Sequence, residues 1–218
     1  MAKARLATTS VQIKAPDLRI VTFEITGDSP LVIHRFSTKV KEQMQKKMEE
    51  GKSASSKKNR EPKNSDDTFF ESRYISKEGF DGFHAASIRN AMISACRLVN
   101  FKMTLAKMSI FVLADGWDKT EPQIPLIRIY GKAVKQSDMA RVETGQPYVT
   151  TRACYNPWSA KIRIRFDADQ FSVEDVSHLL SRVGQQVGIG EGRHDSKNSA
   201  GMGWGCFSLK QAAKEVAA

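Results

Sequence analysis

The sequence predicts a single α+β domain whose antiparallel sheet carries helices on one face, in an RRM- or ferredoxin-like arrangement. Short segments with a period of two alternate with two longer segments whose apolar residues recur every three or four positions. Their order fits a β-α-β-β-α-β core with an added insertion and a projecting hairpin. The chain of 218 residues, 40% hydrophobic and 27% charged, is long enough to bury such a core.

The N-terminal part is expected to contain a flexible arm at 1–17 and then the start of one RRM-like domain spanning 18–210. Residues 18–26 alternate as a strand does, and a turn of Gly, Asp, Ser and Pro separates them from a short apolar strand at 31–33. Helix formers follow Ser37. Residues at about 50–67 lack any large apolar side chain, so we expect a mobile basic insertion over a binding groove.

The later elements are predicted from their periodicity and turn residues. In chain order they are a strand at 68–76, a turn at 79–82, a helix at 84–100, strands at 108–114 and 124–130 joined by a Gly-Trp-Asp turn, a hairpin at about 133–158, a strand at 161–166, a helix from the Ser172 capping box to about 187, a final strand at roughly 203–209 and a tail at 211–218.

The net charge of +10 favours a polyanionic partner, either nucleic acid or an anionic membrane surface. No apolar run approaches the roughly 18 residues that span a bilayer, and the basic N-terminal segment lacks the apolar stretch of a secretory signal. We therefore expect no membrane partner. The three cysteines are odd in number and widely spaced, which predicts no disulfide framework and a cytoplasmic location, in the bacterial host if the chain is phage-encoded. The sequence contains no CxxC or HxxxH pair, so we expect no metal site. We also expect no cofactor.

A glycine-rich segment at 184–205 is the most informative part of the sequence. Its glycines predict positive φ angles and backbone N–H groups open to a ligand, and the basic and polar residues between them suit phosphate contact. A flexible loop before an edge strand is the alternative. The segment lacks the order of a Walker or Rossmann loop. The residues are Gly188, Gly190, Gly192, Arg193, His194, Lys197, Asn198, Gly201, Gly203 and Gly205.

Three cations alternate with three apolar residues at 161–166. Period two places Lys161, Arg163 and Arg165 on one sheet face, where a polyanion relieves their mutual repulsion; a solvated face is the alternative. Residues 35–63 add eight lysines and two arginines against four glutamates, and such an arm can follow a phosphate backbone. Trp158 and Trp204 suit base stacking or core packing.

The four histidines, His34, His84, His178 and His194, are scattered without metal-ligand spacing. His34 and His194 each adjoin an arginine and are candidates for acid–base work, with a structural or phosphate-contacting role as the alternative.

Two segments carry a resemblance to a known family. The segment from Val187 to Phe207, with its two glycine clusters and Arg193, resembles the C-terminal glycine-rich loop of the RAMP superfamily, which includes Cas7-like backbone proteins of CRISPR effectors. The stretch from Gly82 to Ala91 resembles the family's entry into a helix. Residues from Pro30 to Phe36 are similar to a motif of uncharacterised bacteriophage proteins.

The resemblance implies an RRM-like core, a projecting hairpin and oligomerisation along a strand of RNA or DNA. It places Arg193 and both glycine clusters at the phosphates and Arg89 near the groove. Trp204 and Cys206 stand where the family usually has a basic residue, which is a departure from its pattern.

The resulting expectation is a non-catalytic protein that binds single-stranded RNA or DNA and forms a homo-oligomer or filament along it, as a Cas7-like backbone or in phage single-strand DNA binding or recombination. The alternatives are a metal-independent endoribonuclease with His34 or His194 as general base, and a structural assembly protein. The expected nucleic-acid-binding residues are Arg35, Lys39, Lys46, Lys57, Lys58, Arg73, Arg89, Arg152, Lys161, Arg163, Arg165, Gly190, Gly192, Arg193, His194, Lys197, Gly201, Gly203 and Trp204.

Overall fold

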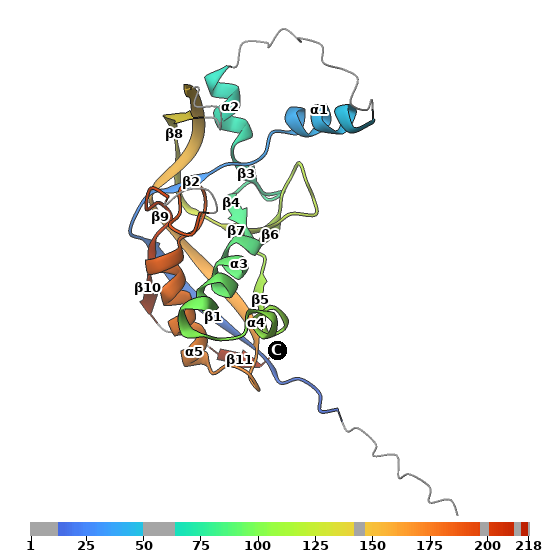
Figure 1. Ribbon diagram of the computed structural model, residues 1–218, viewed down its shortest axis with the longest axis vertical. Coiled ribbons are helices and arrows are strands. Elements are labelled where there is room, and N and C mark those ends of the chain that lie inside the picture. The colour runs from blue at the N-terminus through green and yellow to red at the C-terminus, as the bar shows by residue number, and fades with distance from the viewer. Residues whose placement is uncertain (1–12, 50–63, 142–146, 197–200, 212–214, 218) are drawn as a thin grey trace, which may run out of the picture.

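A computed structural model describes residues 13–49, 64–141, 147–196, 201–211 and 215–217, and shows an α+β fold with two antiparallel sheets (Figure 1). The main sheet is organised around one long strand, β9 (Pro147–Asp167). One edge of β9 pairs with β1 and β2, and the other edge pairs with β5 and β8. The partner strands are β1 (Leu18–Gly27), β2 (Leu31–Ile33), β5 (Ile110–Leu113) and β8 (Tyr130–Arg141), with β10 (Phe207–Gln211) and β11 (Glu215–Ala217) along the far side of β1.

Strict alternation separates the two faces of this sheet. Ile162, Ile164 and Phe166 of β9 are fully buried, and Val21 and Phe23 of β1 lie with them in one hydrophobic core. Helices α3 (Ala85–Ala95) and α5 (Val173–Arg182) contribute their apolar side chains to the same core. The odd-numbered cations of β9 therefore point to the opposite face, as the sequence predicts.

Local signals explain where these helices begin. The His84 side chain caps α3 by accepting a hydrogen bond from the Ala86 N–H at 3.0 Å. Ser172 and Asp175 form a reciprocal capping box at the start of α5, which confirms the sequence prediction. Helix α5 continues as a π-helical turn, Val183–Val187, to Gly188. A 3-10 turn, Cys96–Val99, extends α3 to the end of the predicted helix.

The second sheet has the strand order β3-β4-β7-β6. It contains β3 (Tyr74–Ile75), β4 (Asp81–His84), β6 (Gly116–Trp117) and β7 (Pro125–Arg128). The strand β6 lies where the sequence predicted only a turn between two strands. Strand β6 is only two residues long and forms by pairing with β7, and so short a segment has no sequence pattern that predicts a strand.

One predicted strand is wrong. Residues 68–76 form most of helix α2 (Ser65–Glu71), followed by the short β3. Asn64 caps this helix by accepting from the Asp66 N–H, and Asp66 and Asp67 stand in its positively polarised first turn. The expected strand did not take this cap into account, and helix α4 (Met103–Ser109) was not predicted.

Several boundaries differ from the predicted ones. Helix α1 (Thr38–Glu49) agrees with the helix expected after Ser37, whereas residues 65–67 of the expected insertion belong to α2. The final strand begins at Phe207 rather than 203, and part of the expected tail forms β11. The expected arm at 1–12 and most of the insertion lie outside the described residues.

The predicted hairpin and the strand after it form one continuous structure. Strand β8 pairs antiparallel with β9 from Tyr130–Ser159 to Arg141–Pro147. The same β9 then runs on through 161–166 into the centre of the main sheet. The hairpin is therefore anchored directly in the sheet that carries the cationic strand.

Candidate nucleic-acid interface

The described residues of 188–205 form a compact structure, which we call the glycine platform. All six of its glycines adopt positive φ angles, between 71° and 77°, which confirms the backbone conformation expected from the sequence.

Close backbone packing explains most of these glycines. A Cβ atom on Gly205 would lie 1.8 Å from the Ile189 carbonyl oxygen, and one on Gly201 would lie 2.1 Å from that of Arg193. The Ile189 N–H donates to the Gly205 carbonyl at 3.1 Å, so the two halves of the platform lie against each other. The glycines thus serve the fold of the platform itself.

Two carboxylates fix the platform to the rest of the molecule. Glu191 accepts from Arg152 Nε at 2.7 Å, and its backbone N–H donates to the Val32 carbonyl at 2.9 Å. Asp195 pairs with Arg97 at 2.9 Å and accepts from the Ser94 hydroxyl, both on or next to α3. The platform is therefore held at β2 and β9 on one side and at α3 on the other.

The outer rim of the platform keeps some polar groups available. His194 is exposed, and Arg193 donates to the Gly190 carbonyl at 3.0 Å. Within the described residues, the N–H groups of Gly190, Gly192 and Gly203 have no hydrogen-bond partner. The Trp204 ring lies half-buried against Gly192 and is not a free stacking surface.

The outer face of the main sheet, which we define by the outward residues of β1, β5 and β9, presents the three predicted cations. Lys161 lies opposite Glu24 and pairs with it at 3.1 Å, with both side chains more than half exposed. Arg163 pairs with Asp115 at 3.2 Å and remains 42% exposed. These exposed contacts are weak in water and leave the cations available to a polyanion.

Two arginines contact one aromatic ring at this face. The guanidinium carbon of Arg165 lies 5.0 Å from the ring centroid of Phe111, and that of Arg89 lies 5.4 Å from it. Strand pairing places Phe111 directly opposite Arg165. Arg89 reaches the ring from α3 and is oriented by a 2.9 Å hydrogen bond to the Ile110 carbonyl. The expected strand at 108–114 contains Phe111, but its sequence pattern does not mark Phe111 as a binding residue.

Three arginines expected at the nucleic acid instead pair with carboxylates of the protein, with Arg35 and Arg152 buried and Arg73 partly buried. Arg35 is 9% exposed and pairs with Glu121 at 3.2 Å and Asp118 at 3.5 Å. Arg73 donates twice to Asp81 at 2.8 Å, and Arg152 is buried against Glu191. Sequence spacing does not reveal these carboxylate partners, because they come from distant parts of the chain.

Other predicted residues lie at separate positions or outside the described part of the chain. Lys46 is exposed on α1. Trp158 is buried and donates its indole N–H to the Ser29 carbonyl at 2.8 Å, so it packs in the core. The side chain of Lys39 and the residues Lys57, Lys58, Lys197 and Asn198 lie outside the described residues.

The histidines do not meet in one place. His34 Nδ1 lies 3.4 Å from Glu191, and burial together with the nearby Arg152 lowers the His34 pKa. Burial also lowers the pKa of His84, the cap of α3. His178 is exposed on α5. Among the described residues, no group of three or more His, Cys, Asp or Glu side chains is placed to hold a metal ion.

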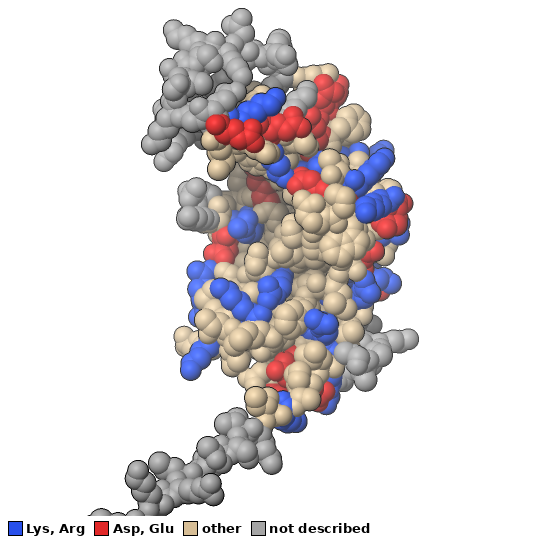
Figure 2. Space-filling view, turned by 90° about the vertical axis from the view of Figure 1, so that its right-hand side faces the viewer, with Lys and Arg blue, Asp and Glu red and all other residues tan. Residues whose placement is uncertain are grey.

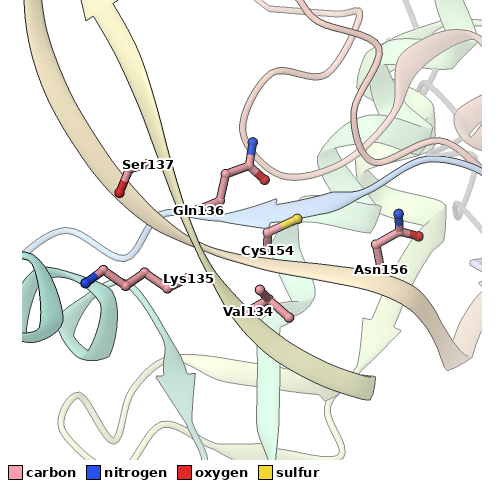
Figure 3. A pocket seen from close by; sticks show the side chains of 6 residues that line it. All are labelled: Val134, Lys135, Gln136, Ser137, Cys154 and Asn156. Atoms are coloured by element: carbon pink, nitrogen blue, oxygen red, sulfur yellow. The ribbon is translucent and has the colours of Figure 1, made fainter.

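A depression of about 440 Å³ is lined by side chains of the paired strands β8 and β9 (Figure 3). Its one cation, Lys135, is paired with Asp66 at 2.7 Å. Burial and the nearby Asp138 raise the pKa of the Cys154 thiol, which keeps it protonated and weakly nucleophilic. The lining therefore supplies no converging catalytic groups. It consists of Val134, Lys135, Gln136, Ser137, Cys154 and Asn156.

Charge is unevenly distributed over the side of the molecule shown in Figure 2. Acidic side chains form a band near the end where α1 and α2 lie, and Lys and Arg side chains are spread over the middle and lower part. No helix in the described part of the chain is long and apolar enough to cross a membrane. Comparison with known proteins found no matching family model and no matching curated protein.

Proposed function

We propose that this protein binds single-stranded nucleic acid across the outer face of its main sheet, does no chemistry of its own, and assembles as a homo-oligomer or filament along the strand. One observation carries the proposal: the Phe111 ring contacts Arg89 and Arg165, beside Arg163. The exposed part of this half-buried ring and the planar guanidinium groups over it can stack on a base, and the cations attract its phosphates.

The topology supports an RRM-like assignment of the core. The strands β10, β1, β9 and β5 are neighbours in that order, and each neighbouring pair is antiparallel. Helix α3 lies between β1 and β5 in the chain, and α5 lies between β9 and β10. A β-α-β-β-α-β core with this order places both helices on one face and leaves the other face for a ligand.

The glycine platform has a secondary place in this proposal. Its exposed rim, with His194, Arg193 and the unpaired N–H groups, contacts phosphates where the strand leaves the sheet. A Cas7-like role predicts preference for RNA, and a phage single-strand binding or recombination role predicts preference for DNA.

Fluorescence anisotropy with labelled single-stranded RNA, single-stranded DNA and duplex DNA tests the proposal across a salt series. We expect tight single-strand binding that weakens steeply with salt, because each neutralised phosphate releases counterions. Arg165→Gln should weaken binding about tenfold, while the matched control Arg182→Gln, on α5 at the other face, should not.

Equal and weak binding to all three ligands would overturn the proposal. If oligomers form without nucleic acid and ignore it when it is added, the structural assembly role replaces it.

Metal-independent RNA cleavage is the second candidate, and one cluster favours it. Glu191 lies between the His34 imidazole at 3.4 Å and Arg152 Nε at 2.7 Å. The lowered pKa of His34 keeps its imidazole neutral at pH 7 and able to accept a proton. Incubation of labelled RNA with EDTA tests this function, which predicts cleavage that His34→Ala and Glu191→Gln abolish. Intact RNA would remove it.

A further inference from the structure

A second cluster, which consists of two aromatic rings and one arginine, lies where the two sheets meet. The guanidinium carbon of Arg128 lies 5.1 Å from the ring centroid of Tyr130 and 5.5 Å from that of Phe80. Arg128 is exposed, and Tyr130 is 44% exposed. Among the described residues no carboxylate forms an ion pair with the Arg128 guanidinium; the Asp115 carboxylate accepts from the Arg128 backbone N–H at 3.0 Å.

The fold makes room for this cluster. Arg128 ends β7, and Tyr130 begins β8. A Cβ atom on Gly116 of β6 would lie 2.6 Å from Glu78 Oε2 and 2.9 Å from the Phe80 ring, so glycine at this position leaves room for both side chains. The lack of a side chain at Gly116 therefore lets the Phe80 ring lie against β6.

Strand register connects this cluster to the outer face. Tyr130 lies directly opposite Ser159, which is two residues before Lys161 on β9. Residues two apart on a strand share a face and lie about 7 Å from each other. The exposed row thus continues from Arg165 through Lys161 to Tyr130 and Arg128.

The chemistry of the two clusters is the same. A guanidinium stacked on a ring is weakly hydrated and stays positioned to meet a phosphate, while the remaining exposed ring surface can stack on a base. Simple core packing does not account for Tyr130, because nearly half of its surface is in contact with solvent.

We propose that Phe80, Arg128 and Tyr130 form a second base-stacking site, which extends the nucleic-acid surface from the main sheet onto the second sheet. This inference rests on the proposed single-strand binding and specifies its path. It predicts that an oligonucleotide must exceed a minimum length to contact both clusters.

Binding of short and long single strands by the full chain tests the site. We expect Arg128→Gln and Tyr130→Leu each to weaken an oligonucleotide of about 16 nucleotides by roughly fivefold or more, and to leave one of about 6 nucleotides unchanged. Arg165→Gln should weaken both lengths. Tyr130→Phe keeps the ring and should bind as the wild type does, and Arg182→Gln is the charge-matched control.

Photocrosslinking with a bromouracil-containing strand gives an independent readout. We expect adducts at Tyr130 with the long strand only. The second site is wrong, and the proposed function stands, if Arg165→Gln weakens binding, Arg128→Gln and Tyr130→Leu leave binding unchanged, and no crosslink forms at Tyr130. If the wild type binds neither length, both fall together.

Discussion

The glycine platform and the outer sheet face use similar residue types in opposite ways. In the platform, polar groups are used within the protein: Glu191 neutralises the buried Arg152, and the glycines permit contact between backbone segments. On the outer face, Arg163 and Arg165 are partly exposed beside a ring; Arg163 pairs with Asp115 and donates to the Ala114 carbonyl, and no ion pair neutralises Arg165 within the described residues. Glycines and cations therefore indicate a binding role only where the fold does not need them for close backbone packing or for a buried ion pair.

The comparison separates two kinds of mutational effect. Changes in the platform should lower the free energy of unfolding, whereas changes on the outer face should weaken binding and leave stability almost unaltered. A variant that violates this division would show that the two regions are misassigned.

The largest effect is expected from Gly205→Ala. The added Cβ would lie 1.8 Å from the Ile189 carbonyl oxygen, at a φ of 71° that favours glycine. We expect the free energy of unfolding to fall by about 3 kcal/mol or more, measured by denaturant titration.

Gly203→Ala is the matched control, because its nearest neighbour is His194 at 3.4 Å and only the positive φ is penalised. It should cost about 1 kcal/mol. Equal losses for the two variants would contradict the close-packed account of the platform.

A smaller loss of stability is expected from Glu191→Gln. The substitution leaves the Arg152 guanidinium buried without a counterion, while Glu191 itself is 37% exposed and partly screened. We expect a loss of about 2 kcal/mol in chemical denaturation. Glu24→Gln removes the exposed partner of Lys161 and should change stability by less than about 0.5 kcal/mol. The interpretation fails if Glu24→Gln is the more harmful change.

The smallest effect concerns α3, which contacts the outer face through Arg89 and reaches the platform through Arg97 of the 3-10 turn that follows it. Burial holds the pKa of its cap, His84, below 6.5, so the unfolded chain takes up the proton more readily. Stability should be complete above about pH 6.5 and decline as the pH falls through 6.5 toward the lowered folded value.

His84→Asn retains a capping acceptor that does not titrate near neutral pH. It should show a smaller decrease in melting temperature between about pH 7.5 and 5.5, and His84→Ala should cost about 1 kcal/mol at pH 7.5. A pH dependence that is the same in the wild type and His84→Asn would exclude His84 as its source.

The sequence predicted those parts of the structure that depend on local pattern. The alternation at 161–166 correctly separated buried from outward residues, and Ser172 marked the start of α5. Helix α2 was missed because a cap at Asn64 outweighs the β propensity of the residues after it.

The candidate site was harder to predict because partners come from distant segments. Arg35 and Asp118 are 83 positions apart, and Arg152 and Glu191 are 39 apart, so single-sequence reasoning treated both arginines as free. The Phe111 ring could be expected on a strand, but not its contacts with Arg89 and Arg165, because these depend on the pairing of β5 with β9.

The most direct test of the central claim is the salt dependence of single-strand binding by two multiple variants. One replaces Lys161, Arg163 and Arg165 of the outer face with glutamine, and the other replaces Arg193 and His194 of the platform rim. The account predicts that the outer-face variant reduces the magnitude of the negative slope of log K against log salt by about 2, because three phosphate contacts are lost. The rim variant should reduce this magnitude by less than about 1. The opposite ranking would place the nucleic acid on the glycine platform and contradict the account.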